Sequence, residues 1–195
     1  MRIAITGNIG SGKSVFSSFA EKNGFSVLKA DDISKQILST DPEVRKEIIK
    51  AFGDQSYKNN KPDVKYLAQK VFSDPARLNK IESILHPRVI KSINDSMQRI
   101  QKENKTIFVE AALIYEANME KIFDYVVLIT SKRELRLKRK LKNGISEDDF
   151  IKRESSQIAE DEKRKRADFI FANDGSVNDL QSKFNLMLLT LGIGK

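Results

Sequence analysis

The sequence predicts a three-layer α/β/α protein in which helices cover both faces of a five-stranded parallel sheet. Two patterns support this prediction: short apolar runs rich in β-branched residues, and longer segments with helical spacing that alternate with them. With 195 residues, of which 39% are hydrophobic, the chain is long enough to bury one core. We therefore expect a single domain over residues 1–195 that carries an inserted helical region.

Five short apolar runs are the predicted strands, because each is rich in β-branched or aromatic residues. They are residues 2–6, 25–28, 106–110, 125–130 and 169–171. Helical spacing instead marks residues 13–23, 132–142 and 177–191. Ser146, which three acidic residues follow, is a candidate helix N-cap. Strands that alternate with helices in this way predict a parallel sheet.

The region of about residues 32–104 differs, because it shows helical patterns and no strand-like run. Proline, glycine and polar stretches divide it at residues 41–42, 53, 56–62, 74–75 and 86–87. We expect a break at His86-Pro87 and a new helix from about Arg88, since the residue before a proline is biased away from helical conformation. The region is therefore predicted to be a helical insert after the second strand.

The composition excludes several kinds of site. Without cysteine, the chain has no disulfide, no thiolate metal site and no cysteine nucleophile. Its single histidine, His86, excludes sites built on several imidazoles. No apolar run approaches the ~20 residues that a membrane-spanning helix needs, and the first residues do not resemble a signal peptide. We expect a soluble protein of the cytoplasm that does not bind membranes.

The charge balance favours anionic partners. The formal net charge is +8, and seven basic residues lie within residues 132–142 beside the single acid Glu134. A solvated helix face would explain this run equally well. A phosphate site nearby would instead make it part of a binding surface.

Residues 7–14, Gly-Asn-Ile-Gly-Ser-Gly-Lys-Ser, fit the P-loop pattern, with a predicted strand before them and an amphipathic helix after them. Glycines let backbone N–H groups converge on a phosphate, and the following helix directs its N-terminal dipole at the same anion. We expect Lys13 to reach the outer phosphates and the Ser14 hydroxyl to bind Mg²⁺. The predicted nucleotide-binding residues are Gly7, Gly10, Ser11, Gly12, Lys13, Ser14 and Val15. The predicted ligands are ATP and Mg²⁺.

The remaining motifs favour a small-metabolite kinase among P-loop proteins. An Asn-Lys-x-Asp motif, typical of GTPases, is absent, and the third strand ends in Glu110 where larger ATPases have aspartate. Glu110 would either organise Mg²⁺ through water or cap the end of the strand. In such kinases an insert holds the acceptor, and a lid closes over the phosphates and excludes water. The basic helix places the predicted lid at about residues 132–156.

A more specific resemblance extends over nearly the whole chain. The segments that carry it are Ala30-Asp31 with Ile33, Phe52-Gly53, residues 71–74, residues 84–87, residues 110–116, Arg153, Gln157, Glu162-Lys163, residues 166–168 and residues 173–176. In this order and spacing they resemble the dephospho-coenzyme A kinase family. The resemblance implies a P-loop kinase fold and ATP-dependent phosphorylation of the ribose 3′-hydroxyl of dephospho-coenzyme A, which yields coenzyme A and ADP.

Candidate catalytic residues follow from the motifs and the resemblance together. Asp31 comes at the carboxyl end of the second strand, where open α/β sheets bind ligands, and would accept the proton of the acceptor hydroxyl. A role as the N-cap of the following helix would also explain an aspartate at position 31. Arg139 looks like the lid arginine, with Lys138 as the alternative, and Lys142 is the nearest match to a second lid arginine. Lys13 and Arg139 would neutralise charge on the transferring phosphoryl group.

The resemblance also implies binding residues. His86, Leu113 and Glu116 fall in the segments that bind the acceptor. Asn173 and Gly175 lie between the last strand and the last helix and are expected to contact the adenine, although a plain turn would use the same residues.

Two positions depart from the family pattern. Lys29 replaces an aspartate beside Asp31, and it would lower the pKa of Asp31 if it pointed inward. Ala112 replaces a proline, which would relax the turn beneath the acceptor.

Two alternatives remain at this point. A nucleoside or nucleoside-monophosphate kinase shares the architecture, and a P-loop nucleic-acid-binding ATPase would use the basic run. The basic run lacks interleaved aromatic residues, which disfavours single-strand binding. We expect the partners to be ATP and dephospho-coenzyme A, with no nucleic acid, and the protein to be a monomer, although weak self-association is left open.

Overall fold

The computed structural model describes residues 1–72, 74–102 and 105–194 and separates the chain into two compact units. The first comprises Met1–Lys29 and Met97–Lys195, and the second comprises Ala30–Ser96. Residue 73, within the segment 71–74 that carries the resemblance, and residues 103–104, where we expected the end of the helical insert, lie outside the described residues, as does residue 195.

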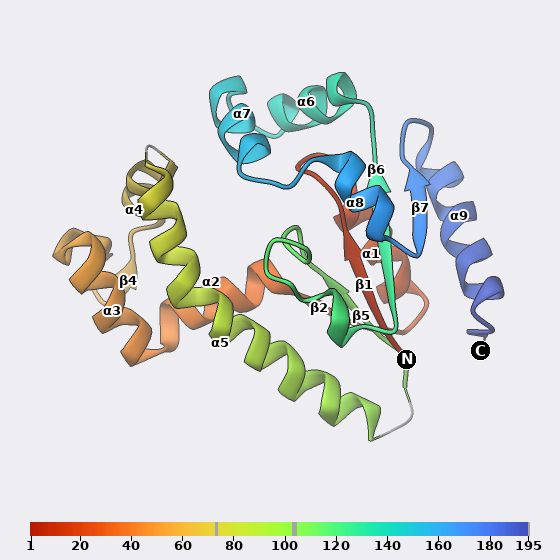
Figure 1. Cartoon of the computed structure of the whole chain (residues 1–195), viewed down its shortest axis with the longest axis horizontal. Helices are drawn as coiled ribbons and strands as arrows, with labels where there is room; N and C mark the ends of the chain where they lie inside the picture. The colour runs from red at the N-terminus through yellow and green to blue at the C-terminus, as the bar shows by residue number, and fades with distance from the viewer. Residues whose placement is uncertain (73, 103–104, 195) are drawn as a thin grey trace. The chain divides into compact units, whose positions relative to one another are not determined.

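The first unit is built on a five-stranded sheet in the order β2-β5-β1-β6-β7. Its strands are β1 (Arg2–Thr6), β2 (Ser26–Lys29), β5 (Ile107–Glu110), β6 (Tyr125–Thr130) and β7 (Phe169–Ala172). Every neighbouring pair is parallel, so the predicted five-stranded parallel sheet is confirmed. Because all carboxyl ends lie at one edge, the segments that follow the strands meet there (Figure 1).

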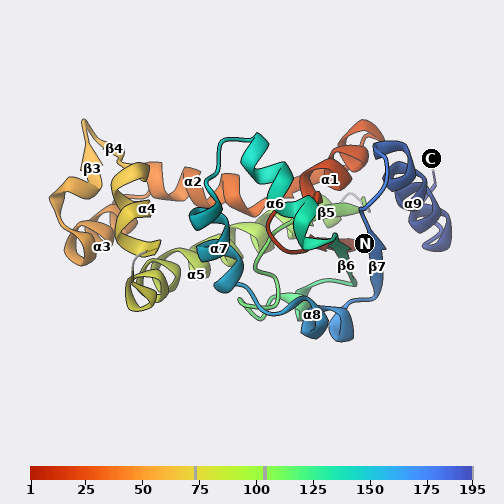
Figure 2. The same ribbon diagram turned by 90° about the horizontal axis from the view of Figure 1, so that it is seen from above.

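Helices cover both faces of this sheet. The helices that lie wholly within this unit are α1 (Lys13–Lys22), η2 (Glu120–Ile122), α6 (Arg133–Lys142), α7 (Glu147–Ser155), α8 (Glu160–Arg166) and α9 (Val177–Thr190). Seen from above, α1 and α9 lie on one side of β6 and β7, and α8 lies on the other (Figure 2). The predicted three-layer α/β/α architecture is therefore confirmed.

Aromatic packing fixes α1 and α9 against the sheet. Phe16 and Phe19 of α1 and Phe184 of α9 are all buried, and their rings pack with each other and with Phe108 of β5 at centroid separations of 5.3–6.4 Å. Burying each of these rings stabilises the fold by roughly 1.5–3 kcal/mol. The start of α1 is consequently held rigidly at the carboxyl edge of β1.

The second unit is mostly helical, as predicted for the insert. Its elements are α2 (Ala30–Thr40), α3 (Pro42–Phe52), η1 (Asp54–Ser56), β3 (Tyr57–Lys58), β4 (Lys61–Pro62), α4 (Val64–Phe72) and most of α5 (Pro75–Gln101). Asp41 caps α3, because its Oδ1 accepts the N–H groups of Glu43 and Val44 at 2.9 and 3.0 Å.

None of the helices that the structure describes is long and apolar enough to cross a membrane.

One short hairpin corrects the expectation that the insert contains no strand. Strands β3 and β4 pair antiparallel around Asn59 and Asn60, whose φ angles are +49° and +62°. Two successive left-handed residues suit a two-residue hairpin turn, and asparagine tolerates that conformation. Strands of two residues are too short to show an alternating pattern, which is why the expectation failed.

Pro87 also behaves differently from the prediction, because α5 continues through it without ending at His86. A proline inside a helix costs about 3 kcal/mol or more. Burial of Ile84 and Leu85 in the core of this unit offsets that cost, since each such side chain contributes roughly 1.5–3 kcal/mol. In addition, the Arg88 guanidinium donates to the Ile84 carbonyl at 2.7 Å, in the turn that the proline disturbs.

Candidate active site at the P-loop

The P-loop connects β1 to α1 and requires glycine where other elements approach it. Gly10 has φ +79°, and a Cβ there would lie 2.6 Å from the Arg136 carbonyl oxygen. Gly12 has φ +102°, and a Cβ there would lie 2.1 Å from Asn173 Nδ2. Helix α6 and the loop after β7 therefore pack directly on the P-loop backbone.

The start of α1 is suited to an external anion. No side chain among the described residues caps this helix, and its first turn contains no acidic residue. Its N-terminal N–H groups and its dipole can therefore act on a bound phosphate. The Lys13 ammonium donates to the Gly7 and Asn8 carbonyls at 2.8 and 3.3 Å, so its charge lies over the loop.

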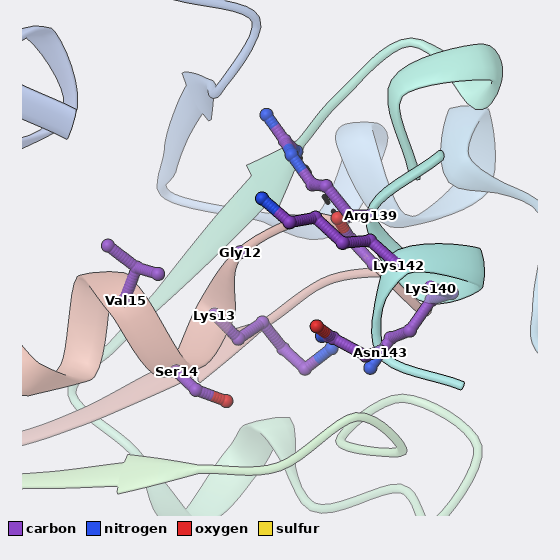
Figure 3. A pocket seen from close by; sticks show the side chains of 9 residues that line it. Gly12, Lys13, Ser14, Val15, Arg139, Lys140, Lys142 and Asn143 are labelled. Atoms are coloured by element: carbon purple, nitrogen blue, oxygen red, sulfur yellow. Dashed lines mark hydrogen bonds between the residues drawn. The ribbon is translucent and has the colours of Figure 1, made fainter. Parts of the chain in front are cut away.

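A pocket with a volume of about 450 Å³ opens between the P-loop and α6. It is lined by Gly10, Gly12, Lys13, Ser14, Val15, Arg139, Lys140, Lys142 and Asn143. Four of these nine residues are cations, and none of the described residues that line the pocket is acidic. Figure 3 shows Lys13 from α1 with Arg139, Lys140 and Lys142 from α6 around the pocket, whereas Val15 points away. This size and charge suit a polyphosphate ligand.

Glu110 lies at the end of β5, beside the P-loop helix. Its Oε1 accepts the Ser14 hydroxyl at 2.6 Å, and its Oε2 accepts the Ser17 hydroxyl at 2.6 Å. A hydroxyl and a carboxylate oxygen are ligands that Mg²⁺ prefers, and Mg²⁺ commonly takes its remaining ligands from phosphates and water. The described residues contain no cluster of three or more histidine, cysteine, aspartate or glutamate side chains that could hold a metal by themselves. The pair of Ser14 and Glu110 thus fits a metal that arrives with a nucleotide.

Arg139 joins the P-loop to the loop after β7. Its Nη1 donates to the Gly10 carbonyl at 3.2 Å and to Ser131 Oγ at 3.0 Å, and its Nη2 donates to the Asn173 carbonyl at 2.7 Å. The Asn173 side-chain amide in turn donates to the Ser11 carbonyl at 2.8 Å. The side chain of Asn173 thus contacts the P-loop backbone, and Gly175 lies beyond it before α9. Lys138 is exposed and does not line the pocket.

Sequence reasoning missed Ser17 and Arg136, and it named Gln157 only among the segments that carry the resemblance, without a role in the site. Arg136 is 6% exposed, donates from Nη1 to the Ile9 carbonyl at 3.2 Å and pairs with Glu154 at 2.6 Å. Arg136 did not stand out in the sequence because it lies within the basic run of residues 132–142, whose charges are also typical of a solvent-exposed helix face. The available signal is the spacing of three residues between Arg136 and Arg139, which places both on one face of α6.

The residues expected to bind the acceptor occupy two different settings. Glu116 and Leu113 lie in the turns after β5, where Glu116 Oε1 accepts the Ile158 N–H at 2.9 Å and lies 2.9 Å from the Lys163 ammonium. Asp31 and His86 belong to the second unit, with Asp31 exposed in the first turn of α2 and His86 half-buried on α5.

The two departures from the family pattern have local contacts. Lys29, the last residue of β2, places its ammonium 2.8 Å from Glu21 on α1. The Ala112 carbonyl accepts the Thr6 hydroxyl at 3.3 Å, which ties the turn after β5 to the end of β1.

Asp174 has a pKa below its ordinary value of about 3.9, chiefly because the Lys132 N–H donates to it at 2.9 Å, and also because Ser131 Oγ donates at 2.9 Å. A carboxylate whose pKa is lowered by folding stabilises the fold at pH values above its unfolded-state pKa. This contribution is lost as the pH falls through its folded-state pKa.

We expect Asp174→Asn to be less stable than wild type at pH 7, and the difference in stability to shrink below about pH 4. Urea unfolding at pH 7 and pH 3 measures this, and a constant difference at both pH values would contradict it.

A parallel α/β/α sheet, a P-loop after its central strand and a cationic pocket above that loop define a P-loop kinase. The chain belongs to the dephospho-CoA kinase family, whose model matches residues 1–179. This confirms the resemblance seen in the sequence.

Individual relatives agree with the family. The dephospho-CoA kinase of Thermus thermophilus is 33% identical over 190 residues, which cover 97% of this chain and 91% of the relative. That of Fusobacterium nucleatum is 35% identical and covers 94% of each chain. Among solved structures, a Thermus thermophilus protein superposes with a TM-score of 0.80 at 32% identity over 98% of this chain and 97% of its own. The dephospho-CoA kinase of Campylobacter jejuni gives 0.73 at 31% identity over 97% and 96%.

Proposed function

We propose that this chain transfers the γ-phosphoryl group of ATP to the ribose 3′-hydroxyl of dephospho-coenzyme A, forming coenzyme A and ADP. The observation that carries this proposal is the cationic pocket above a complete P-loop, in a chain of the dephospho-CoA kinase family. A pocket of this charge suits the donor triphosphate, and the family points to the acceptor.

The P-loop residues would bind and neutralise the donor. Backbone N–H groups at the start of α1 would hold the phosphates, and Lys13 would move from the Gly7 and Asn8 carbonyls to the outer phosphate oxygens. Arg139, which already contacts the loop at Gly10, would meet the same phosphates from α6. Each well-placed donor of this kind supplies about 3–4 kcal/mol of transition-state stabilisation.

Ser14 and Glu110 would hold Mg²⁺. When bound, the ion neutralises charge between the β- and γ-phosphates. The Ser14 hydroxyl could keep donating its proton to Glu110 Oε1, since its oxygen lone pairs would hold the ion, and Ser17 would keep Oε2 in place.

Asp31 would be the general base. Its carboxylate accepts the proton of the 3′-hydroxyl, the 3′-oxygen bonds to the γ-phosphorus, and the bond from that phosphorus to the β–γ bridging oxygen breaks to release ADP. We assign acceptor binding to His86, Leu113 and Glu116. Asn173 and Gly175 remain proposed contacts of the adenine.

Arg139→Ala is expected to lower kcat by about 10²- to 10³-fold with a smaller change in KM for dephospho-coenzyme A. The reason is that charge on the transferring group is greatest in the transition state. Steady-state kinetics with both substrates varied would check this, with Lys138→Ala on the same helix as the control. An effect confined to KM would contradict the proposed role.

The function is tested by ADP release from Mg-ATP with dephospho-coenzyme A, AMP, CMP, UMP and adenosine offered separately, and by locating the phosphate on the product. We expect turnover with dephospho-coenzyme A and a 3′-phosphate. Turnover with a mononucleotide alone would reassign the acceptor. The monomeric state and the cytoplasmic location remain predictions, as do the absence of nucleic-acid and membrane partners.

A further inference from the structure

Ile9, at the tip of the P-loop, is held through both of its backbone polar groups by side chains distant in sequence. Its N–H donates to Gln157 Oε1 at 2.8 Å, and its carbonyl accepts from Arg136 Nη1 at 3.2 Å. Gln157 belongs to the segment between α7 and α8, 148 residues away along the chain. The tip of the loop is therefore fixed by residues that lie outside the P-loop motif.

Gln157 is itself held in place by its neighbours. The next residue, Ile158, donates its N–H to Glu116 Oε1 at 2.9 Å. The same oxygen lies 2.9 Å from the ammonium of Lys163, which is fully buried on α8. We call residues 157–163 the strap. Ile158, near the start of the strap, and Lys163, at its end, both contact Glu116. The backbone that carries the Gln157 side chain is therefore held in place.

Arg136, which donates to the Ile9 carbonyl, is fixed just as firmly. Glu154 Oε1 lies 2.6 Å from its Nη2, and its Nε donates to the Ser131 carbonyl at 3.1 Å. Because Arg136 and Gln157 are each fixed by further contacts, the two peptide groups that flank the Ile9 Cα have little freedom to rotate.

The conformational order of the P-loop at Ile9 directly affects phosphate binding. A P-loop binds phosphates only when several backbone N–H groups converge, and glycines on both sides of Ile9 make the free loop conformationally permissive. A loop ordered during folding does not lose that freedom again when ligand binds, so it binds more tightly. The contact of Gln157 with the loop is made by its amide oxygen, which accepts the Ile9 N–H.

We propose that Gln157 is a positioning residue for nucleotide binding, which fixes the P-loop tip through Ile9 and is itself fixed by the strap's contacts with Glu116. The inference rests on the proposed function only in that the P-loop binds a polyphosphate. It is independent of the acceptor.

The test compares Gln157→Met, which removes the acceptor oxygen at similar size, with Gln181→Met on the exposed face of α9. Calorimetry would measure the Kd of Mg-ATP and of magnesium tripolyphosphate, which has no base or sugar. We expect Gln157→Met to weaken both ligands to the same extent, by about 3- to 15-fold, as fits the loss of one hydrogen bond. Gln181→Met should leave both Kd values unchanged.

A second readout separates positioning from general stability. Hydrogen exchange of the Ile9 amide, measured without ligand, should accelerate in Gln157→Met and stay slow in Gln157→Glu, which keeps an oxygen at the same reach. If Gln157→Met does not fold, Gln157→Asn, whose side chain is too short to reach Ile9, takes its place.

Each outcome bears on one proposal or the other. Unchanged Kd values with a lowered Tm would give Gln157 a purely structural role and overturn the inference. A weakening of ATP without a weakening of tripolyphosphate would overturn it too. If wild type binds tripolyphosphate and shows the Gln157 effect but does not phosphorylate dephospho-coenzyme A, the inference stands and the proposed function fails. If wild type binds neither ligand, both fail.

Discussion

Lys13→Ala should lower kcat by about 10²- to 10³-fold and leave the fold intact. The Lys13 ammonium lies over the P-loop, 2.8 Å from the Gly7 carbonyl. Lys13 is also the first residue of α1 and one of the cations that line the pocket. Removing one well-placed donor to a developing negative charge costs about 3–4 kcal/mol in the transition state, which is the basis of the expected loss.

The measurement for this prediction is steady-state turnover of Mg-ATP and dephospho-coenzyme A, together with circular dichroism and urea unfolding. Lys121→Ala removes an exposed lysine that does not line the pocket, and it should behave as wild type. A Lys13→Ala protein that folds, binds ATP and turns over at the wild-type rate would show that the charge is supplied by α6 instead.

Much of the first unit could be predicted because its signals are local. The apolar run Arg2–Thr6 and the glycine pattern after it identify a strand and a P-loop within fourteen residues. Hydrophobic spacing likewise identifies α1 and α9. Patterns of this kind depend on neighbours in sequence, which is why they can be seen without the fold.

Local rules failed where distant packing decides the outcome. The rule that a helix ends before Pro87 is sound for an exposed helix, but it takes no account of the burial of Ile84 and Leu85. The sequence of the basic helix likewise does not reveal that Arg136 is buried. Its partners Ile9 and Glu154 lie 127 residues before it and 18 residues after it.

The site shows the same limit. Ser14 and Glu110 were each predicted from the sequence to serve Mg²⁺, with capping of the strand as the alternative for Glu110, and the structure places their oxygens 2.6 Å apart. The contact of Gln157 with Ile9 was not predicted, since nothing in either segment indicates that residues 148 positions apart share a hydrogen bond. Sequence thus offers candidates for the chemical groups more readily than it indicates the contacts that hold a loop in place.

Asp31→Asn should lower kcat by about 10²- to 10⁴-fold, the range that a positioned general base supplies. The same residue could instead serve α2, because Asp31 and Asp32 are the acidic residues in the first turn of that helix. A carboxylate there stabilises a helix through its dipole, and this role would make the two aspartates equivalent. Asp32 has a partner of its own, Lys35, at 3.1 Å.

Asp32→Asn is therefore the matched control, one residue away in the same exposed turn. We expect similar, small losses of stability in urea for both variants, since each removes one charge from the helix start. Turnover should separate them, with kcat falling only in Asp31→Asn and KM for ATP changing little in either. If both variants lose kcat equally, or neither does, Asp31 acts only at the start of α2, and the proton of the 3′-hydroxyl must pass to another group.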